Sequence, residues 1–166
     1  MSKGPRYRAP FRRRREGRTD YRKRLGLLRS GRPRAVVRKT LSNTIVQFVI
    51  YTPEGDRIVT SAVSKELERY AWKVPRGSVP AAYLTGYLAG KRALEAGLKE
   101  AVLDIGLHPP TRGGRVFAAL KGVLDAGIQV PHDDDILPEE ARIRGDHISK
   151  DVVKLFGEVK AKLEAL

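Results

Sequence analysis

The sequence predicts an α/β fold with a mixed β-sheet, a basic N-terminal arm and a C-terminal helix. Strand-like runs separated by turn residues fill residues 34–62, which is typical of an antiparallel meander. After them, helical patterns alternate with short apolar runs, an order that predicts parallel strands joined by right-handed crossovers. We therefore expect a basic arm with a short helix at 1–33, an α/β core at 34–131, and an extension with a terminal helix at 132–166.

The positive charge is concentrated in the first quarter of the chain. Sixteen Lys and Arg residues lie within residues 3–39, against the two acids Glu16 and Asp20, so this segment carries +14. The remaining residues hold 17 basic and 17 acidic side chains and are neutral. Because a concentrated positive field attracts polyanions, the arm predicts a polyanionic partner.

The arm favours nucleic acid over a membrane. Membrane-surface helices carry Trp, Phe or Leu along one face, whereas Pro5, Pro10 and Gly17 interrupt this segment. No apolar run reaches the ~18 residues of a membrane span, and the basic start lacks the apolar core of a signal peptide. Arginine, which supplies most of the charge, offers a planar fork that suits phosphates and base edges.

Residues 1–17 are expected to be disordered without a partner. Their charges repel one another, and the prolines forbid a continuous helix. Tyr7 and Phe11 are interleaved with the arginines. They either stack on unpaired bases or anchor the arm to the domain, and the sequence leaves both alternatives open.

Residues 19–29 predict a short helix. Thr19 suits its N-cap, and Tyr21, Leu25 and Leu28 share one apolar face. Since that face needs something to pack on, we expect the helix to dock on the domain and turn its cations outward.

The β-branched and aromatic composition of the meander predicts three strands. These are residues 34–40, 44–51 and 57–62. Alternation on the first strand places Arg38 and Lys39 on opposite faces. Together with Arg34, they either extend the positive surface onto the sheet or act as edge charges that block aggregation.

The rest of the chain predicts helices and two further extended segments. Helical runs are expected at 64–71, 81–96, 115–126 and 149–166, and extended ones at 101–105 and 128–130. Gly86 and Gly90 lie four residues apart in the longest internal helix. Their bare backbone on one side predicts close packing against a neighbouring element.

The sequence gives no positive case for catalysis. His132 with residues 133–135 resembles a metal cluster, but consecutive carboxylates on a loop usually point apart, which favours a solvated acidic turn. Asp104 would serve a nuclease only with a second carboxylate within ~4 Å of the same metal pair, and no spacing indicates one. The three His residues lack a recognisable nucleophile partner. We expect a protein that is not an enzyme and has no cofactor or metal.

Three long stretches together resemble a known family. They are RTDYRKRLGLLRSGRPRAVVRKTLSN (18–43), AAYLTGYLAGKRALEAGLKEAVLDIGL (81–107) and PTRGGRVFAALKGVLDAGIQVPH (110–132). They are similar to the archaeal and eukaryotic-like form of the large-subunit ribosomal protein family numbered eighteen, in the same order and over nearly the whole chain. RIRGDHI (142–148) matches the archaeal-type C-terminal extension, which shorter bacterial relatives lack.

The resemblance implies a structural protein of the large ribosomal subunit, located in the cytoplasm. It implies that the chain binds 5S rRNA and helps attach it to 23S rRNA in the central protuberance, beside neighbouring ribosomal proteins. The implied fold is a mixed sheet with helices on both faces, similar to the ribonuclease-H-like layered arrangement but without its catalytic acids.

The resemblance also implies which residues contact RNA. The matches to RTDYRKRL and GRPRAVVRK give Arg18, Tyr21, Arg22, Lys23, Arg24, Arg32, Arg34, Arg38 and Lys39. The irregular start adds Arg6, Tyr7, Arg8, Phe11, Arg12, Arg13, Arg14 and Arg15.

Two other functions remain alternatives. A Mg²⁺-dependent RNA-processing nuclease would use Asp104 and residues 133–135. A general nucleic-acid-compacting protein would use the charge of the arm without selecting structured RNA.

Overall fold

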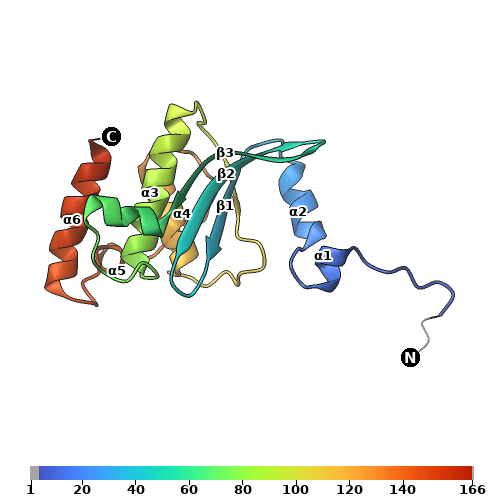
Figure 1. The fold of residues 1–166 in the computed structure, drawn as a ribbon, viewed down its shortest axis with the longest axis horizontal. Coiled ribbons are helices and arrows are strands. Elements are labelled where there is room, and N and C mark those ends of the chain that lie inside the picture. The colour runs from blue at the N-terminus through green and yellow to red at the C-terminus, as the bar shows by residue number, and fades with distance from the viewer. Residues whose placement is uncertain (1–3, 166) are drawn as a thin grey trace.

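A four-stranded mixed sheet lies at the centre of the structure (Figure 1). The computed structural model describes residues 4–165. β1 (Arg34–Lys39) pairs antiparallel with β2 (Thr44–Thr52), and β2 pairs antiparallel with β3 (Gly55–Val63). On its other side β1 pairs parallel with β4 (Val102–Asp104), giving the order β3-β2-β1-β4. The predicted meander and parallel pairing are confirmed.

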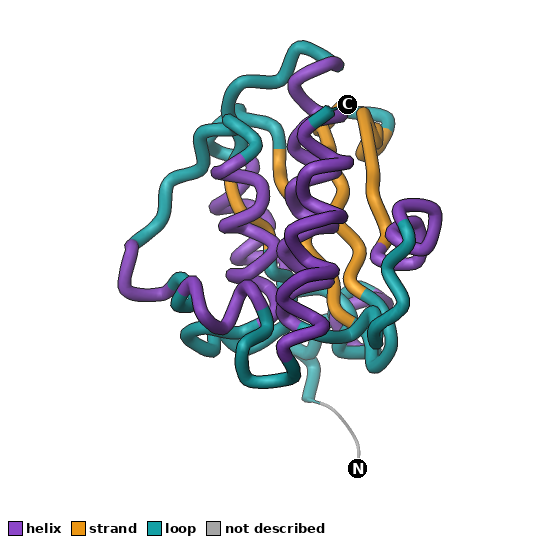
Figure 2. Tube along the Cα trace, turned by 90° about the vertical axis from the view of Figure 1, so that its left-hand side faces the viewer, coloured by secondary structure: helices purple, strands orange, loops and turns teal. Residues whose placement is uncertain are grey.

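Three long helices form layers against one face of this sheet. α3 (Val79–Glu95) packs on β2 and β3, and α4 (Arg115–Asp125) packs on β1. α6 (Lys150–Glu164) packs on α3 from outside, and Figure 2 shows helices in front of the strands. The shorter helices are η1 (Ser64–Tyr70), η2 (Asp134–Ile136) and α5 (Glu140–Arg144).

The N-terminal helices lie on the opposite side of the sheet from α3 (Figure 1). α1 (Arg12–Arg15) is a single turn whose four arginines are all exposed, and α2 (Tyr21–Leu28) follows it. Helices therefore flank both faces, as predicted. The helical turn of α1 falls in a segment that the sequence predicts to be disordered; it is closed by backbone hydrogen bonds such as Arg15 N–H to Phe11 C=O at 3.0 Å.

Glycines bring α3 and α4 into close contact. A Cβ at Gly86 would collide with the backbone of Ala119, and one at Gly90 would lie 2.6 Å from the Ala126 Cβ. Gly122 of α4 is just as constrained, because its Cβ would collide with the Tyr83 carbonyl. The close packing predicted from the two α3 glycines is confirmed.

Local details differ from the expectations in two places. The N-cap of α2 is Asp20 and not Thr19, since the Asp20 carboxylate accepts hydrogen bonds from the backbone N–H groups of Arg22 and Lys23. Residues 132–147, where the sequence predicted no helix or strand, contain η2 and α5. Across residues 4–165, no helix is both long and apolar enough to cross a membrane.

Candidate nucleic-acid interface

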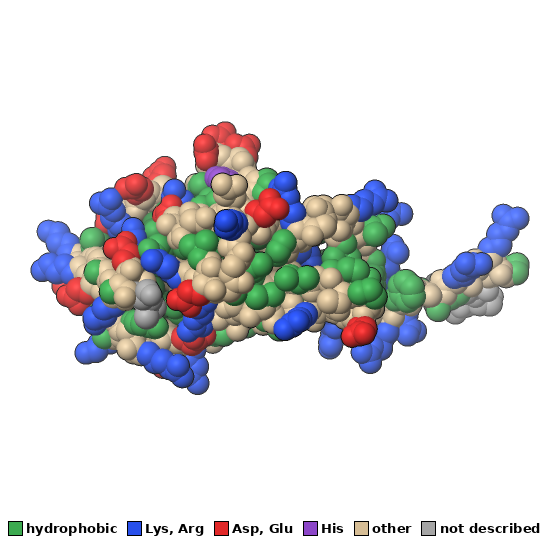
Figure 3. All heavy atoms as spheres, turned by 90° about the horizontal axis from the view of Figure 1, so that it is seen from above, with side chains coloured by type: hydrophobic (Ala, Val, Ile, Leu, Met, Phe, Trp, Pro, Cys, Tyr) green, Lys and Arg blue, Asp and Glu red, His purple; other side chains and the backbone are tan. Residues whose placement is uncertain are grey.

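Exposed cations dominate the segment that leads into the sheet. Ten of the residues expected from the sequence to contact RNA are exposed cations: Arg6, Arg8, Arg12, Arg13, Arg14, Arg15, Arg18, Arg22, Lys23 and Arg32. Figure 3 shows Lys and Arg side chains projecting around this narrow part of the molecule. Glu16 contacts Arg12 at 3.8 Å and Arg18 at 3.2 Å. Glu100 of the body contacts Arg32 at 3.3 Å. These two carboxylates offset a small share of the charge, so the surface can attract phosphates.

The second acid of the segment, Asp20, starts α2. Its carboxylate accepts hydrogen bonds from the backbone N–H groups of Lys23 (3.2 Å) and Arg22 (3.0 Å). The hydrogen bond from the Lys23 backbone is the main cause that lowers the pKa of Asp20 below its ordinary value. The carboxylate therefore stays ionised at the helix N-terminus, where negative charge is favourable.

α2 does not bury its apolar face as expected. Leu25 is 53% exposed, and all eight residues of α2, each of them described, keep some exposed surface. The Phe11 ring instead packs on the Tyr21 ring at a centroid distance of 5.3 Å. This contact favours anchoring for Phe11, although its side chain is still 73% exposed. Tyr7 is 46% exposed, and its role in base stacking stays a prediction.

Three of the expected RNA-contacting arginines belong to an ion-pair cluster with two carboxylates. Arg24 of α2 binds Asp56 through both guanidinium ends, at 2.8 and 2.7 Å. Asp56 also accepts from Arg34 at 2.6 Å, and Arg34 donates to Asp104 at 2.8 Å. Asp104 accepts from Arg38 as well, at 2.9 Å. We call these five residues the sheet cluster.

The sheet cluster removes Arg34 from the exposed surface. Its side chain is 3% exposed, so the expectation that it extends the positive surface is wrong. The physical reason is its position on β1, where Asp56 of β3 and Asp104 of β4 flank it on the same side of the sheet. Arg24 and Arg38 keep exposed fractions of 30% and 38% in their side chains, but both are paired.

Both carboxylates of the sheet cluster are held in the charged form. Burial alone would raise the pKa of Asp104, but the positive charge of Arg38 and the hydrogen bonds from Arg38 and Arg34 outweigh it and lower the pKa. The hydrogen bond from Arg24 lowers the pKa of Asp56. The Gly106 backbone N–H also donates to Asp104 at 2.9 Å.

The acidic groups considered for metal binding have structural contacts instead. Asp133 caps η2 by accepting from the Asp135 backbone N–H, and His132 lies 3.3 Å from Asp134. Within the described part of the chain, no group of three or more acidic or His side chains could hold a metal ion.

A second set of cations, of which the sequence had indicated only Lys39, lies on segments that meet beside the sheet. Arg115 donates to the carbonyls of Thr40 (3.1 Å) and Gly77 (3.0 Å), which joins the β1–β2 turn to the loop before α3. The Lys39 backbone N–H donates to His108 Nε2 at 3.2 Å, which adds the loop after β4. We call four cations of these segments the loop cations: Lys39 at the end of β1, Lys73 and Arg112 in the loops before α3 and α4, and Arg115 at the start of α4.

The electrostatics of His108 support this grouping. Burial lowers its pKa, and the nearby charges of Lys39, Arg38 and Arg115 lower it further. A local charge count would have revealed the loop cations, because residues 70–94 and 105–124 contain no acid. The net charge summed over residues 40–166 is zero, so it gave no indication of these cations. Arg29, just after α2, is another exposed cation outside the expected set.

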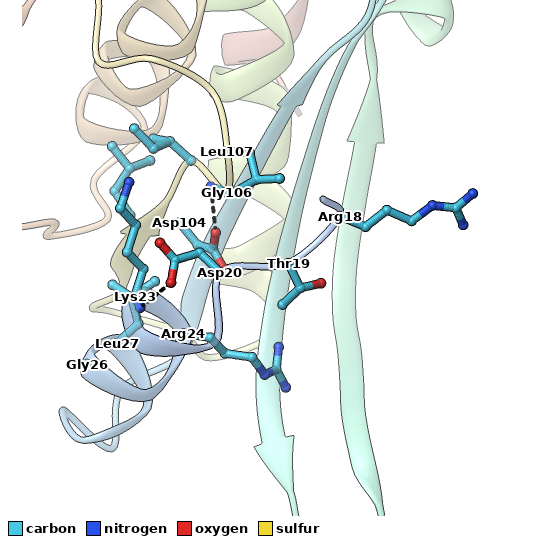
Figure 4. Close-up of a pocket in the computed structure, with 12 residues that line it drawn as sticks. Arg18, Thr19, Asp20, Lys23, Arg24, Gly26, Leu27, Asp104, Gly106 and Leu107 are labelled. Carbon is cyan, nitrogen blue, oxygen red and sulfur yellow. Dashed lines mark hydrogen bonds between the residues drawn. The ribbon is translucent and has the colours of Figure 1, made fainter. Parts of the chain in front are cut away.

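A groove of about 410 Å³ separates α2 from the end of β4 (Figure 4). Its floor is largely apolar, with Leu27 on one side and Leu103 and Leu107 on the other. Arg18 and Lys23 also line it. The groove shows that α2 stands away from the sheet instead of packing tightly on it.

Comparisons with known proteins place the chain among ribosomal proteins. Residues 5–100 and 95–133 match the family model of ribosomal large subunit proteins 60S L5 and 50S L18. The large ribosomal subunit protein uL18 of Korarchaeum cryptofilum is 58% identical over 155 residues, covering 93% of this chain and 80% of that protein. The protein of the same name from Natronomonas pharaonis is 56% identical over 150 residues, covering 90% and 82%.

Proposed function

The chain belongs to the family of ribosomal large subunit proteins 60S L5 and 50S L18, and from this premise we propose that it binds 5S rRNA and helps attach it to 23S rRNA in the central protuberance. The coarser role follows from the family itself. The protein is a structural component of the large ribosomal subunit in the cytoplasm, and it is not an enzyme.

The observation that carries the proposal is the exposed charge of the arm and α2. Folded RNA hides its bases in a deep, narrow major groove, so proteins recognise it through shape, phosphates and 2′-hydroxyls. Arginines on a short helix and an extended segment can follow such a backbone and bind phosphates through paired hydrogen bonds. The neutral body behind them supplies a rigid base.

The proposed RNA-contacting set follows exposure. It comprises the exposed arm cations already named, together with Tyr7, Phe11, Tyr21 and the additional cation Arg29. Arg34 is excluded by its burial, while Arg24 and Arg38 act chiefly through the sheet cluster. The loop cations provide a separate positive surface, and we assign to them the contact with a second RNA segment, for which 23S rRNA is the candidate.

Competition binding tests this function. Labelled 5S rRNA is bound to the full chain at a fixed salt concentration and displaced with unlabelled 5S rRNA, an unrelated A-form RNA duplex, or duplex DNA. We expect 5S rRNA to displace the label at far lower concentration than either duplex, because the non-specific part of binding is common to all polyanions. Equal displacement by all three would indicate a general nucleic-acid-compacting protein instead.

A further inference from the structure

Apolar packing contributes little to the orientation of α2. Leu25 is 53% exposed, and the groove of about 410 Å³ lies between α2 and β4 (Figure 4). An eight-residue helix is also too short to be stable by itself. The angle at which α2 presents its cations must therefore depend on polar contacts.

The polar contact of α2 with the body is the pair of Arg24 and Asp56. Figure 4 shows Arg24 extending from α2 toward the strands. Both of its terminal nitrogens donate to the Asp56 carboxylate, at 2.8 and 2.7 Å, which fixes direction as well as distance. Asp56 lies at the start of β3, just after the β2–β3 turn, and Tyr51 of β2 is its strand partner.

Asp56 is in turn bound by Arg34 of the sheet. Its Oδ2, which accepts from Arg24, also accepts from Arg34 at 2.6 Å. Arg34 is 3% exposed and is also bound to Asp104. A chain of charge-assisted hydrogen bonds thus runs from the buried sheet to the exposed helix. Each carboxylate along it is kept ionised, since the pKa values of Asp56 and Asp104 both lie below the ordinary range.

We propose that Asp56 is a positioning residue for RNA binding: through Arg24 it fixes α2 so that Arg22, Lys23 and Arg29 are already arranged for phosphates before RNA arrives. The inference rests on the proposed RNA-binding function and names a residue that does not itself contact RNA. Its physical basis is preorganisation, because a helix that is already oriented loses less conformational freedom on binding.

Charge repulsion alone predicts the opposite effect of Asp56 on RNA affinity. A carboxylate beside a cationic surface repels phosphate, so its removal should tighten RNA binding by charge alone. If Asp56 positions α2, its removal should weaken binding even though the net charge becomes more positive. The two accounts therefore differ in the direction of the effect.

The test compares Asp56→Asn with Glu54→Gln in the full chain. Glu54 lies in the β2–β3 turn, two residues before Asp56, and forms no ion pair within residues 4–165. Glu54→Gln therefore makes the same charge change without affecting Arg24. With 5S rRNA as the probe at fixed salt, Asp56→Asn is expected to bind about three- to tenfold more weakly. Glu54→Gln is expected to match the parent or bind slightly more tightly. Equal or tighter binding by Asp56→Asn overturns the proposal.

Hydrogen exchange gives a readout independent of RNA contact. Arg24→Gln breaks the link to α2 but leaves the Asp56–Arg34 pair in place. Amides of α2 in the free variant should exchange faster than in the parent, while those of α3 stay unchanged. Unchanged exchange in α2 would overturn the positioning role even if Asp56→Asn failed to fold. A parent chain without preference for 5S rRNA would instead refute the proposed function, and the exchange result would still stand.

Discussion

The side chains of Arg34 and Asp104 meet in a buried ion pair at the base of the sheet cluster. Burying two charges costs free energy, which close geometry and extra hydrogen bonds must offset. Asp104 accepts from Arg34, Arg38 and the Gly106 N–H, whereas the Arg34 Nε is buried without a partner among the described residues. Such a pair adds little net stability, but removing one partner destabilises the protein because the other buried charge loses its compensation.

Replacing Asp104 with Asn should therefore destabilise the protein. At pH 7 the free energy of unfolding is expected to fall by about 2–4 kcal/mol, because Arg34 and Arg38 lose the carboxylate that they share and the buried Arg34 keeps only Asp56. Chemical unfolding of the full chain measures this difference.

The pH dependence has a definite sign. The pKa of Asp104 is lower in the folded state than its ordinary value of 3.8, so its contribution is present above that value and disappears as pH falls through the folded pKa. The difference in the free energy of unfolding between the parent and Asp104→Asn should thus decrease as the pH falls from 5 to about 2. A difference that stays constant over this range would contradict the ion-pair account.

The sequence showed that the sheet cluster contains arginines, but it did not show which carboxylates they bind. Asp56 lies 22 residues and Asp104 lies 70 residues from Arg34 along the chain, so sequence spacing gives no indication of the pairing. The predicted N-cap of α2 was wrong by one residue. Thr19 and Asp20 are adjacent and both residue types suit that position, and the hydrogen bonds from the Arg22 and Lys23 N–H groups identify Asp20 as the cap.

The helix pair α3 and α4 is the tightest contact between elements. The sequence indicated a close approach at Gly86 and Gly90, because glycines four apart leave one side of a helix bare. It did not identify Gly122 as the matching residue on α4, since that requires knowing how the helices cross. The strands were predicted closely because alternation and turn residues are local signals.

Gly122→Ala tests this crossing. The added Cβ would collide with the Tyr83 carbonyl and lie 2.7 Å from the Tyr87 backbone nitrogen, so neither atom can move as a flexible side chain would. We expect a loss of about 2–3 kcal/mol in the free energy of unfolding. The matched control is Gly157→Ala in α6, where a Cβ meets nothing within 4 Å among the described residues.

The control should change stability in the opposite direction. Alanine is favoured over glycine in a helix interior by up to about 1 kcal/mol, so Gly157→Ala should raise the melting temperature. If Gly122→Ala unfolded at the same temperature as the parent, the two helices would not be packed as closely as the structure indicates.

For the whole molecule, the charge distribution decides the function. The sequence predicted a basic arm at residues 1–33 and a neutral body after it. In the structure, carboxylates of the body pair with Arg24, Arg32, Arg34 and Arg38, whereas Arg29 and the cations before Arg24 are exposed. We therefore propose that the main RNA-binding surface is the run of cations up to Lys23, to which Arg29, Arg32 and the loop cations add. The independence of the core at 34–131 and of the extension at 132–166 stays a prediction.

The salt dependence of 5S rRNA binding tests this division most directly. The full chain is compared with a chain that begins at residue 18, which lacks seven cations and one acid. For the full chain we predict that affinity falls by roughly 10³-fold or more between 50 and 200 mM salt, as expected when about six or more phosphates are neutralised. The shortened chain should keep a cooperative thermal transition and show a clearly shallower slope. Equal slopes for the two chains, or a shallow slope for the full chain, would contradict the account.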